Sequence, residues 1–184
     1  MVVIRPTRKL HSAIPPTVGR GPSDTALGDW YVNRLVVDRR PLLLLVSSTS
    51  LLPILVPARD VRGLPGRLAA LVASRVRRMG TGSHIIDHEL QAMAEVVVGP
   101  TVDRSVVGIM VDFAKGIPSY LEPGQWDEDT LPMVEDRLAE TPCYAGRSFE
   151  QVVFPDKAAP ERLTAMWLAN RPLQPTSVER IRIH

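Results

Sequence analysis

The most regular stretch of the chain runs from residue 29 to residue 57, where three apolar runs alternate with two polar turns. Each run is rich in leucine, valine and isoleucine, and each is bounded by turn-forming residues, as strands are. The turns are Asp38-Arg39-Arg40-Pro41 and Ser47-Ser48-Thr49-Ser50. The pattern predicts three consecutive strands of one antiparallel sheet.

The rest of the pattern predicts helices around that sheet. Short strands over 1–5 and 95–101 bring the sheet to about four to five strands. Apolar residues at helical spacing predict helices over 64–79, 84–94 and 103–121, one helix within 126–140, and a last helix that begins at Pro160. The predicted class is α+β, a small antiparallel sheet with helices packed mainly on one face. We expect a core domain over residues 1–122 and an acidic, mostly helical extension over residues 123–184 that packs on it.

A membrane-spanning helix is the alternative for Pro41 to Ala58, which is 18 residues long and mostly apolar. Four consecutive hydroxyl residues at its centre and three prolines favour strands of a folded domain instead. We therefore expect no membrane association, and the N-terminus shows no secretory signal. The single cysteine, Cys143, excludes an internal disulfide and fits a reducing cytoplasm. The chain has no P-loop or other cofactor-binding motif, so no cofactor is expected.

Charge is distributed unevenly along the chain. Residues 1–80 contain 13 Lys and Arg against 4 Asp and Glu, a net charge of +9, and residues 81–184 contain 9 against 16, a net charge of −7. The division indicates either a basic face for an anionic partner or two parts that attract each other within the fold. The candidate nucleic-acid-binding or anion-binding residues are Arg39, Arg40, Arg67, Arg77 and Arg78.

The predicted helix over 64–79 carries the densest group of these arginines. Its outer side is either an ordinary solvated face or a contact surface, and the sequence leaves both open. Arg75 falls on the apolar side beside Leu68 and Leu71. We expect its guanidinium to reach water or to pair with a carboxylate.

The predicted helix over 103–121 combines a regular apolar stripe with an unusual polar row. Arg104, Gly108 and Asp112 recur every four residues and so share one side of the helix. Glycine inside a helix costs about 1 kcal/mol relative to alanine and often marks a close approach. Two interpretations stay open: a ligand groove with a cation at one end and a carboxylate at the other, or close helix-on-strand packing with an internal Arg-Asp pair.

Two histidines and the cysteine carry further potential chemistry. His84 and His88 lie four residues apart on one helix face, a spacing that can hold a divalent metal. No third strong ligand is near them in the sequence, so they are weak metal candidates and no bound metal is expected. Cys143 follows a proline in a predicted loop without a neighbouring histidine, which favours an inert thiol over a nucleophile.

Two segments carry a resemblance to a known family. The first reads W-x-x-N-x-L-x-x-D-R-R, with Trp30, Asn33, Leu35 and the Asp38-Arg39-Arg40 turn. The second, residues 103–112, reads DRSVVGIMVD where the family has N-R-S-V-L-G-S-M-N-D. On these motifs, about residues 1–120 resemble an uncharacterised bacterial family of domains of unknown function, family 6933.

The resemblance implies no established chemistry, but it does imply which residues act together. The residues that it assigns to one site are Trp30, Asn33, Arg104, Ser105 and Asp112. Ile109 and Val111 replace small and amide residues of the family, so any ligand contacts made at those positions would be lost in this chain. The acidic C-terminal third is expected to be an elaboration of this chain alone.

The sequence supports three functions in order. The leading one is a non-enzymatic binding module whose basic surface engages a nucleic acid or an acidic protein. Because aromatic residues make up only 5% of the chain, double-stranded or structured nucleic acids are favoured over single strands. The second is an enzyme acting on a nucleotide or another phosphorylated small molecule, with Arg104 holding the anion beside Ser105 and Gly108, and Asp112 as acid or base. The third is a component of a toxin-antitoxin or phage-defence pair with an operon-encoded partner, and a homo-oligomer also stays open.

Overall fold

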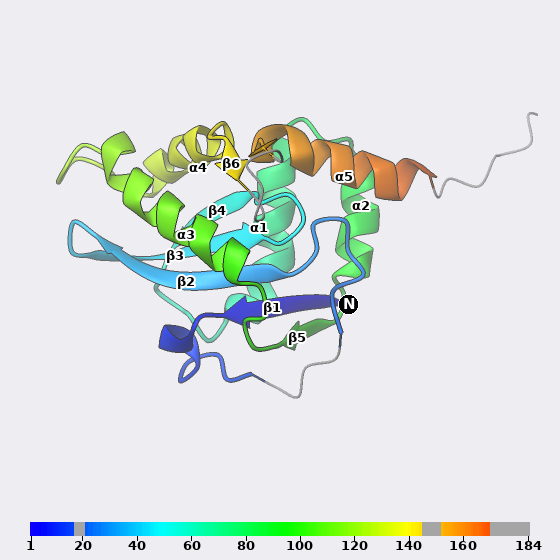
Figure 1. Cartoon of the computed structure of the whole chain (residues 1–184), viewed down its shortest axis with the longest axis horizontal. Coiled ribbons are helices and arrows are strands. Elements are labelled where there is room, and N and C mark those ends of the chain that lie inside the picture. Colours follow the sequence, from blue (N-terminus) through cyan, green and yellow to red (C-terminus); the bar gives the residue numbers. More distant parts are fainter. Residues whose placement is uncertain (17–20, 145–151, 170–184) are drawn as a thin grey trace, which may run out of the picture.

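Five strands form one mixed sheet at the centre of the molecule (Figure 1). The computed structural model describes residues 1–16, 21–144 and 152–169. The spatial order of the strands is β4-β3-β2-β1-β5. Their bounds are β1 Val2–Pro6, β2 Trp30–Val37, β3 Arg40–Ser47, β4 Pro53–Pro57 and β5 Val96–Val98.

The sheet is antiparallel on one side and parallel on the other. β2, β3 and β4 form the predicted meander, with Tyr31 opposite Val46 and Leu44 opposite Leu55. β1 runs parallel to both β2 and β5, and it lies between them. The predicted α+β class and strand number are confirmed, while the all-antiparallel arrangement is not. β1 and β2 are parallel because a long connection brings the chain back, so that β2 starts at the same end of the sheet as β1. A hairpin between them would have made the pair antiparallel.

Helices surround the sheet. The α-helices are α1 Leu64–Arg78, α2 Ser83–Ala92, α3 Arg104–Gly116, α4 Leu131–Ala139 and α5 Pro155–Ala169. Short 3-10 helices are η1 Arg8–Leu10, η2 Ile117–Tyr120 and η3 Glu128–Thr130, and β6 Cys143–Tyr144 pairs with β7 Val152–Val153. The predicted cap of α3 is present, since the Asp103 side chain accepts from the backbone amide of Ser105. The last helix begins earlier than predicted, because Pro155 already suits a first helical turn, and Pro160 lies inside it.

Helices cover both faces of the sheet, which corrects the expectation that they pack mainly on one. Leu43 and Leu45 of β3 belong to a core with residues of α1, α2 and α5, whereas Leu42, Leu44 and Val46 belong to a second core with residues of α3 and α4. In Figure 1, α3 crosses in front of the sheet and α1 lies behind it. The reason is that β3 is apolar on both of its faces, so neither face can be left exposed to water.

The tight turn between β2 and β3 has a left-handed backbone. Asp38 and Arg39 have φ angles of 48° and 64°, and Val37 pairs directly with Arg40. Two successive residues with positive φ are typical of a two-residue hairpin turn whose twist matches that of the strands. The predicted turn is therefore present, and it projects Arg39 into solvent.

The segment after residue 122 contributes to the second core. Trp126, Leu131, Val134 and Leu138 are buried there beside residues of β3 and α3. α4 also contacts β4, the outer strand of the meander. No helix in the described ranges has both the length and the apolar character that crossing a membrane would require.

The carboxylate of Glu89 in α2 joins three segments. It accepts hydrogen bonds from the backbone amides of Ala26 and Leu27, at 2.9 and 3.1 Å, and from the indole Nε1 of Trp167 in α5, at 2.7 Å. Its residue is only 1% exposed. Burial raises the pKa of Glu89, against the opposing effect of these three hydrogen bonds.

Replacing Glu89 with glutamine should therefore change how stability depends on pH. Because burial raises the pKa of this carboxyl group, the stability that its protonation contributes is complete below the ordinary value of 4.5 and is lost as the pH rises through the folded-state pKa. The unfolding free energy of the wild type minus that of Glu89→Gln should fall from pH 4.5 towards neutrality, by at most about 1.4 kcal/mol per pH unit. Urea unfolding of both proteins across this range measures the difference. A difference that stays constant or rises with pH contradicts the prediction.

Candidate functional site

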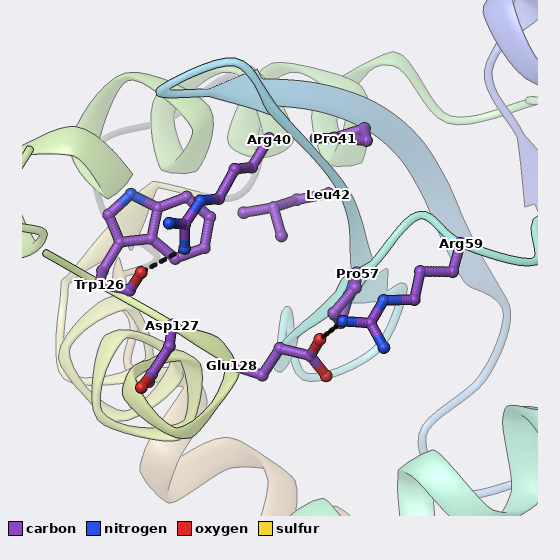
Figure 2. A pocket seen from close by; sticks show the side chains of 8 residues that line it. All are labelled: Arg40, Pro41, Leu42, Pro57, Arg59, Trp126, Asp127 and Glu128. Carbon is purple, nitrogen blue, oxygen red and sulfur yellow. Dashed lines mark hydrogen bonds and ion pairs between the residues drawn. The ribbon is translucent and has the colours of Figure 1, made fainter. Parts of the chain in front are cut away.

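A cleft of about 380 Å³ opens where the β2–β3 hairpin, the end of β4 and the start of η3 meet (Figure 2). Its volume lies in the range of ligand pockets. It is lined by Arg40, Pro41, Leu42, Pro57, Arg59, Trp126, Asp127 and Glu128. Arginines stand on two sides of a floor formed by Leu42 and Pro57. Of the five predicted anion-binding arginines, Arg40 is the one that this cleft contains.

One wall of the cleft is an arginine stacked on a tryptophan. The guanidinium carbon of Arg40 lies 4.9 Å from the centre of the Trp126 ring, and its Nη1 donates to the backbone carbonyl of Trp126. The indole Nε1 donates to Asp38 at 2.8 Å, and the same carboxylate oxygen accepts from the backbone amide of Gly124 at 3.1 Å. Asp38 and Arg40 of the sequence motif thus hold residues 124–126 against the hairpin. The Arg40 side chain is pre-positioned by this contact.

The other wall is an exposed ion pair. Arg59 donates to Glu128, and their side chains are 80% and 51% exposed. An ion pair this exposed stabilises a protein by about 0–1 kcal/mol, so another anion can replace Glu128 with little loss of stability. The neighbouring Asp127 is occupied as the cap of η3, since it accepts from the backbone amide and the hydroxyl of Thr130. The cleft therefore offers one fixed and one exchangeable guanidinium above an apolar floor.

A smaller cavity of about 200 Å³ adjoins the cleft and shares Pro57 and Glu128 with it. It lies between α1, β4 and α4 and contains the buried carboxylate of Glu135. One oxygen of Glu135 accepts from the backbone amide of Leu55 at 2.7 Å, and the other pairs with Arg78 and lies 3.7 Å from Nε of Arg75. Glu135 thus occupies a backbone donor of β4 that the β3 pairing leaves unused.

The basic face predicted on α1 is neutralised from within the chain only in part, since Arg78 is its one member with a carboxylate partner among the described residues. Arg75 is 2% exposed and also pairs with Asp136 at 2.5 Å, so the expectation that it finds a carboxylate is confirmed. Arg78 pairs with Glu135, and Arg67 donates to the backbone carbonyl of Asp60 at 2.6 Å. Arg77 is exposed, and its side chain makes no hydrogen bond or ion pair within the described ranges. The acidic part of the chain thus pairs with Arg75 and Arg78, and it leaves Arg67 and Arg77 without a carboxylate partner among the described residues.

The row on α3 forms neither of the two arrangements left open by the sequence. Arg104, Gly108 and Asp112 all lie on the exposed side of the helix, and none of the four best-formed cavities among the described residues is lined by both Arg104 and Asp112. A Cβ atom at Gly108 would meet nothing within 4 Å. Asp112 approaches Lys115 at 3.7 Å and does not pair with Arg104. Neither an internal Arg-Asp pair nor a close helix-on-strand contact explains the glycine.

Ser105 serves the structure of the helix end. Its hydroxyl donates to Asp103 at 2.5 Å, and this hydrogen bond holds the pKa of Asp103 below its usual range. The backbone amide of Asp103 in turn donates to the hydroxyl of Tyr31 in β2 at 3.0 Å. The conspicuous motif around Ser105 therefore fastens the start of α3 to the sheet.

The five residues assigned to one site by family resemblance do not all lie on the same side of the sheet. Trp30 is buried in the core shared with α1, on the face of the sheet opposite α3, and its Nε1 has no hydrogen-bond partner among the described residues. Asn33 accepts from the hydroxyl of Thr7 at 2.9 Å. The expectation fails for Trp30, because neighbouring residues of a strand point to opposite faces and it is Tyr31, not Trp30, that faces α3.

The histidines and the cysteine have structural surroundings. His88 stacks on Trp167 with ring centres 5.9 Å apart, and no group of three potential metal ligands occurs in the part of the chain that the structure describes. His84 is exposed. Burial, with a smaller effect from the charge of Asp112, raises the pKa of the Cys143 thiol to about 11. A thiol with this pKa is protonated at neutral pH and is a poor nucleophile.

Sequence reasoning missed most of the cleft. The candidates did not include Trp126, Arg59 and Glu128, because these residues come from two segments whose meeting with the β2–β3 hairpin depends on the tertiary fold. One local signal was available, since a tryptophan in a Pro-Gly loop is a large apolar side chain that has to find a partner surface.

Comparison with known proteins gives a family. The model of the family described as Domain of unknown function (DUF6933) matches residues 3–158. The match extends well past residue 120, so the expectation that the C-terminal third is an elaboration of this chain alone is wrong as far as residue 158. No curated protein and no solved structure matches the chain.

Proposed function

Since the chain belongs to the family Domain of unknown function (DUF6933), whose description carries no activity, we propose from its geometry that it is a non-enzymatic binding module for an acidic protein partner. The partner presents a carboxylate side chain beside an apolar one. The carboxylate meets Arg59 and Arg40, and the apolar side chain rests on Leu42 and Pro57. The single observation that carries the proposal is the cleft with arginines on two sides of an apolar floor.

The lining of the cleft suits binding better than catalysis. No hydroxyl, thiol or imidazole group is among its lining residues in the described part of the chain. The carboxylate of Asp127 is engaged in a helix cap, and that of Glu128 is the group that the ligand displaces from Arg59. General acid-base chemistry needs a titratable group free to reach the substrate. Arginine, in contrast, is well suited to holding a carboxylate through paired hydrogen bonds.

Charge favours a local acidic segment over a nucleic acid. A long polyanion requires many cations along one surface, because each neutralised phosphate adds to the affinity. Arg75 and Arg78 are committed to Glu135 and Asp136. In the cleft, the carboxylate of Glu128 lies beside Arg59, and it would repel the successive phosphates of a nucleic acid that bound there. A single carboxylate that displaces Glu128 avoids this repulsion.

Selection of peptides from a random library displayed on phage tests the proposal. We expect the selected peptides to carry Asp or Glu next to a large apolar residue, and their affinity to fall as the salt concentration is raised. Arg59→Glu should reduce the affinity of these peptides at least about tenfold, since it puts a like charge where the ligand carboxylate binds. Arg62→Glu is the matched control, because Arg62 is an exposed arginine near in sequence that does not line the cleft.

Two results would contradict the proposal. One is a selection without acidic residues, or peptides that bind Arg59→Glu as tightly as the wild type. The other is fluorescence-detected binding of labelled duplex DNA or RNA that Arg59→Glu does not weaken but Arg77→Glu does. That second result would return the function to the exposed side of α1.

A further inference from the structure

We propose that the exposed side of α3 is a two-fold interface with a second copy of this chain. In this arrangement Arg104 of each copy meets Asp112 of the other, and the two Gly108 residues face each other at the centre. The inference is independent of the cleft, which lies at the β2–β3 hairpin and contains none of these residues.

The surface is available and its charges are unsatisfied. Arg104, Gly108 and Asp112 are exposed, and the adjacent Val111 keeps 44% of its surface exposed. The Arg104 side chain makes no hydrogen bond or ion pair to any described residue. Asp112 is 71% exposed and its only ion pair in the described ranges is the long contact of 3.7 Å to Lys115. Both charges can therefore take a new partner without breaking a strong contact.

The spacing of the three residues is self-complementary. Arg104 and Asp112 each lie four residues from Gly108, which is about 6 Å along the helix axis on either side. A two-fold axis that passes beside Gly108 and runs two α3 helices antiparallel places each arginine against the opposite aspartate. The parallel alternative would place arginine against arginine and aspartate against aspartate. Charge complementarity therefore selects a second copy in one orientation.

Gly108 gives this arrangement its close contact. Side chains four residues apart form ridges, and helices that pack through such ridges cross at about 50° with axes about 8–10 Å apart. Glycine at the crossing point allows the short end of that distance. Within its own chain the missing side chain has no use, because a Cβ atom there would meet open space. A neighbouring backbone at the crossing point explains why α3 has a glycine there, although glycine is, after proline, the least favourable residue inside a helix.

One exposed helix face makes a small interface. A stable complex usually buries about 800 Å² on each partner, more than one 13-residue helix supplies. We therefore expect a dimer of the 20.3 kDa chain that dissociates in the micromolar to millimolar range and weakens with salt. Sedimentation analysis from about 10 µM to about 1 mM at low salt covers this range.

Charge reversal and mixing test the interface directly. Arg104→Glu places two acidic groups at each of the symmetric contacts, and Asp112→Arg places two arginines there. Each variant alone should dimerise at least about tenfold more weakly than the wild type. A one-to-one mixture of the two variants should form a heterodimer, because both contacts then join opposite charges. The double variant Arg104→Glu/Asp112→Arg should dimerise by itself.

Two further variants separate this interface from general effects of charge or size. Arg77→Glu reverses an exposed charge on α1 and should leave dimerisation unchanged. Gly108→Gln should fold normally, as seen by circular dichroism, and should block the dimer, because the side chain points into solvent in the single chain. The proposal is overturned if the wild type is monomeric at the highest concentration, if either reversal leaves the dimer intact, or if the mixed variants fail to associate.

Discussion

Replacing Glu135 with alanine should lower the free energy of unfolding by about 3–5 kcal/mol. Glu135 is 3% exposed, and removing its carboxylate leaves the buried guanidinium of Arg75 with the solvent-exposed Asp136 as its remaining carboxylate partner and strands the backbone amide of Leu55. A buried charge or donor that loses its partner keeps its full desolvation penalty. Urea unfolding followed by tryptophan fluorescence, compared with the wild type under the same buffer, measures the loss.

Asp136 provides a control on the same arginine. It also contacts Arg75, but its side chain is 57% exposed, so water can take over when it is removed. Asp136→Ala should therefore cost about 1 kcal/mol or less. If the two alanine variants lose similar amounts, the burial of Glu135 is not the source of its importance and the prediction is wrong.

The second large effect is expected at Asp29. Its carboxylate pairs with the buried guanidinium of Arg5 and accepts from the backbone amide and the hydroxyl of Ser23, at 2.8 and 2.7 Å. Arg5 and Asp29 are 6% and 7% exposed. Asp29→Ala should lower the free energy of unfolding by about 3–5 kcal/mol, because it isolates a buried cation. Chemical unfolding monitored by circular dichroism gives the value.

A double-mutant cycle identifies the cause of that loss. In an Arg5→Met background no guanidinium is left unpaired, and Asp29→Ala should then cost clearly less than in the wild type. The contacts to Ser23 are lost in both backgrounds, so they cancel in the comparison. Equal costs in the two backgrounds would assign the whole effect to Ser23 and contradict the role of the ion pair.

Local sequence signals predicted the meander and most helices, because the information for them lies within each segment. The turn that begins at Asp38 and the cap at Asp103 are examples, although the left-handed backbone of that turn was not predicted. The position of β1 between β2 and β5 depends on contacts between residues far apart in the chain, which no local pattern contains. The two-sided core was visible in principle in the unbroken apolar run of β3, whose lack of polar alternation indicates burial on both faces.

The candidate residues divide in the same way. Arg40 was found from charge alone, but its stacking on Trp126 joins positions 86 residues apart. The uneven charge of the two halves is explained in part by contacts between them, since Arg59, Arg75 and Arg78 pair with carboxylates after residue 122. Arg104 and Asp112 were placed correctly on one side of a helix, yet neither the groove nor the internal pair left open for them is present among the described residues.

The central position of β1 has a consequence for synthesis on the ribosome. One side of this strand is completed only by β5, and the paired positions Val2 and Val96 are 94 residues apart. At about 5–20 residues per second, a nascent chain carries that open strand side for roughly 5–20 s. An unpaired apolar strand edge can pair with other chains. The nascent chain is therefore most prone to aggregation, and most in need of a chaperone, during this interval. A slower stretch of translation before residue 96 would lengthen the exposure, and a faster one would shorten it.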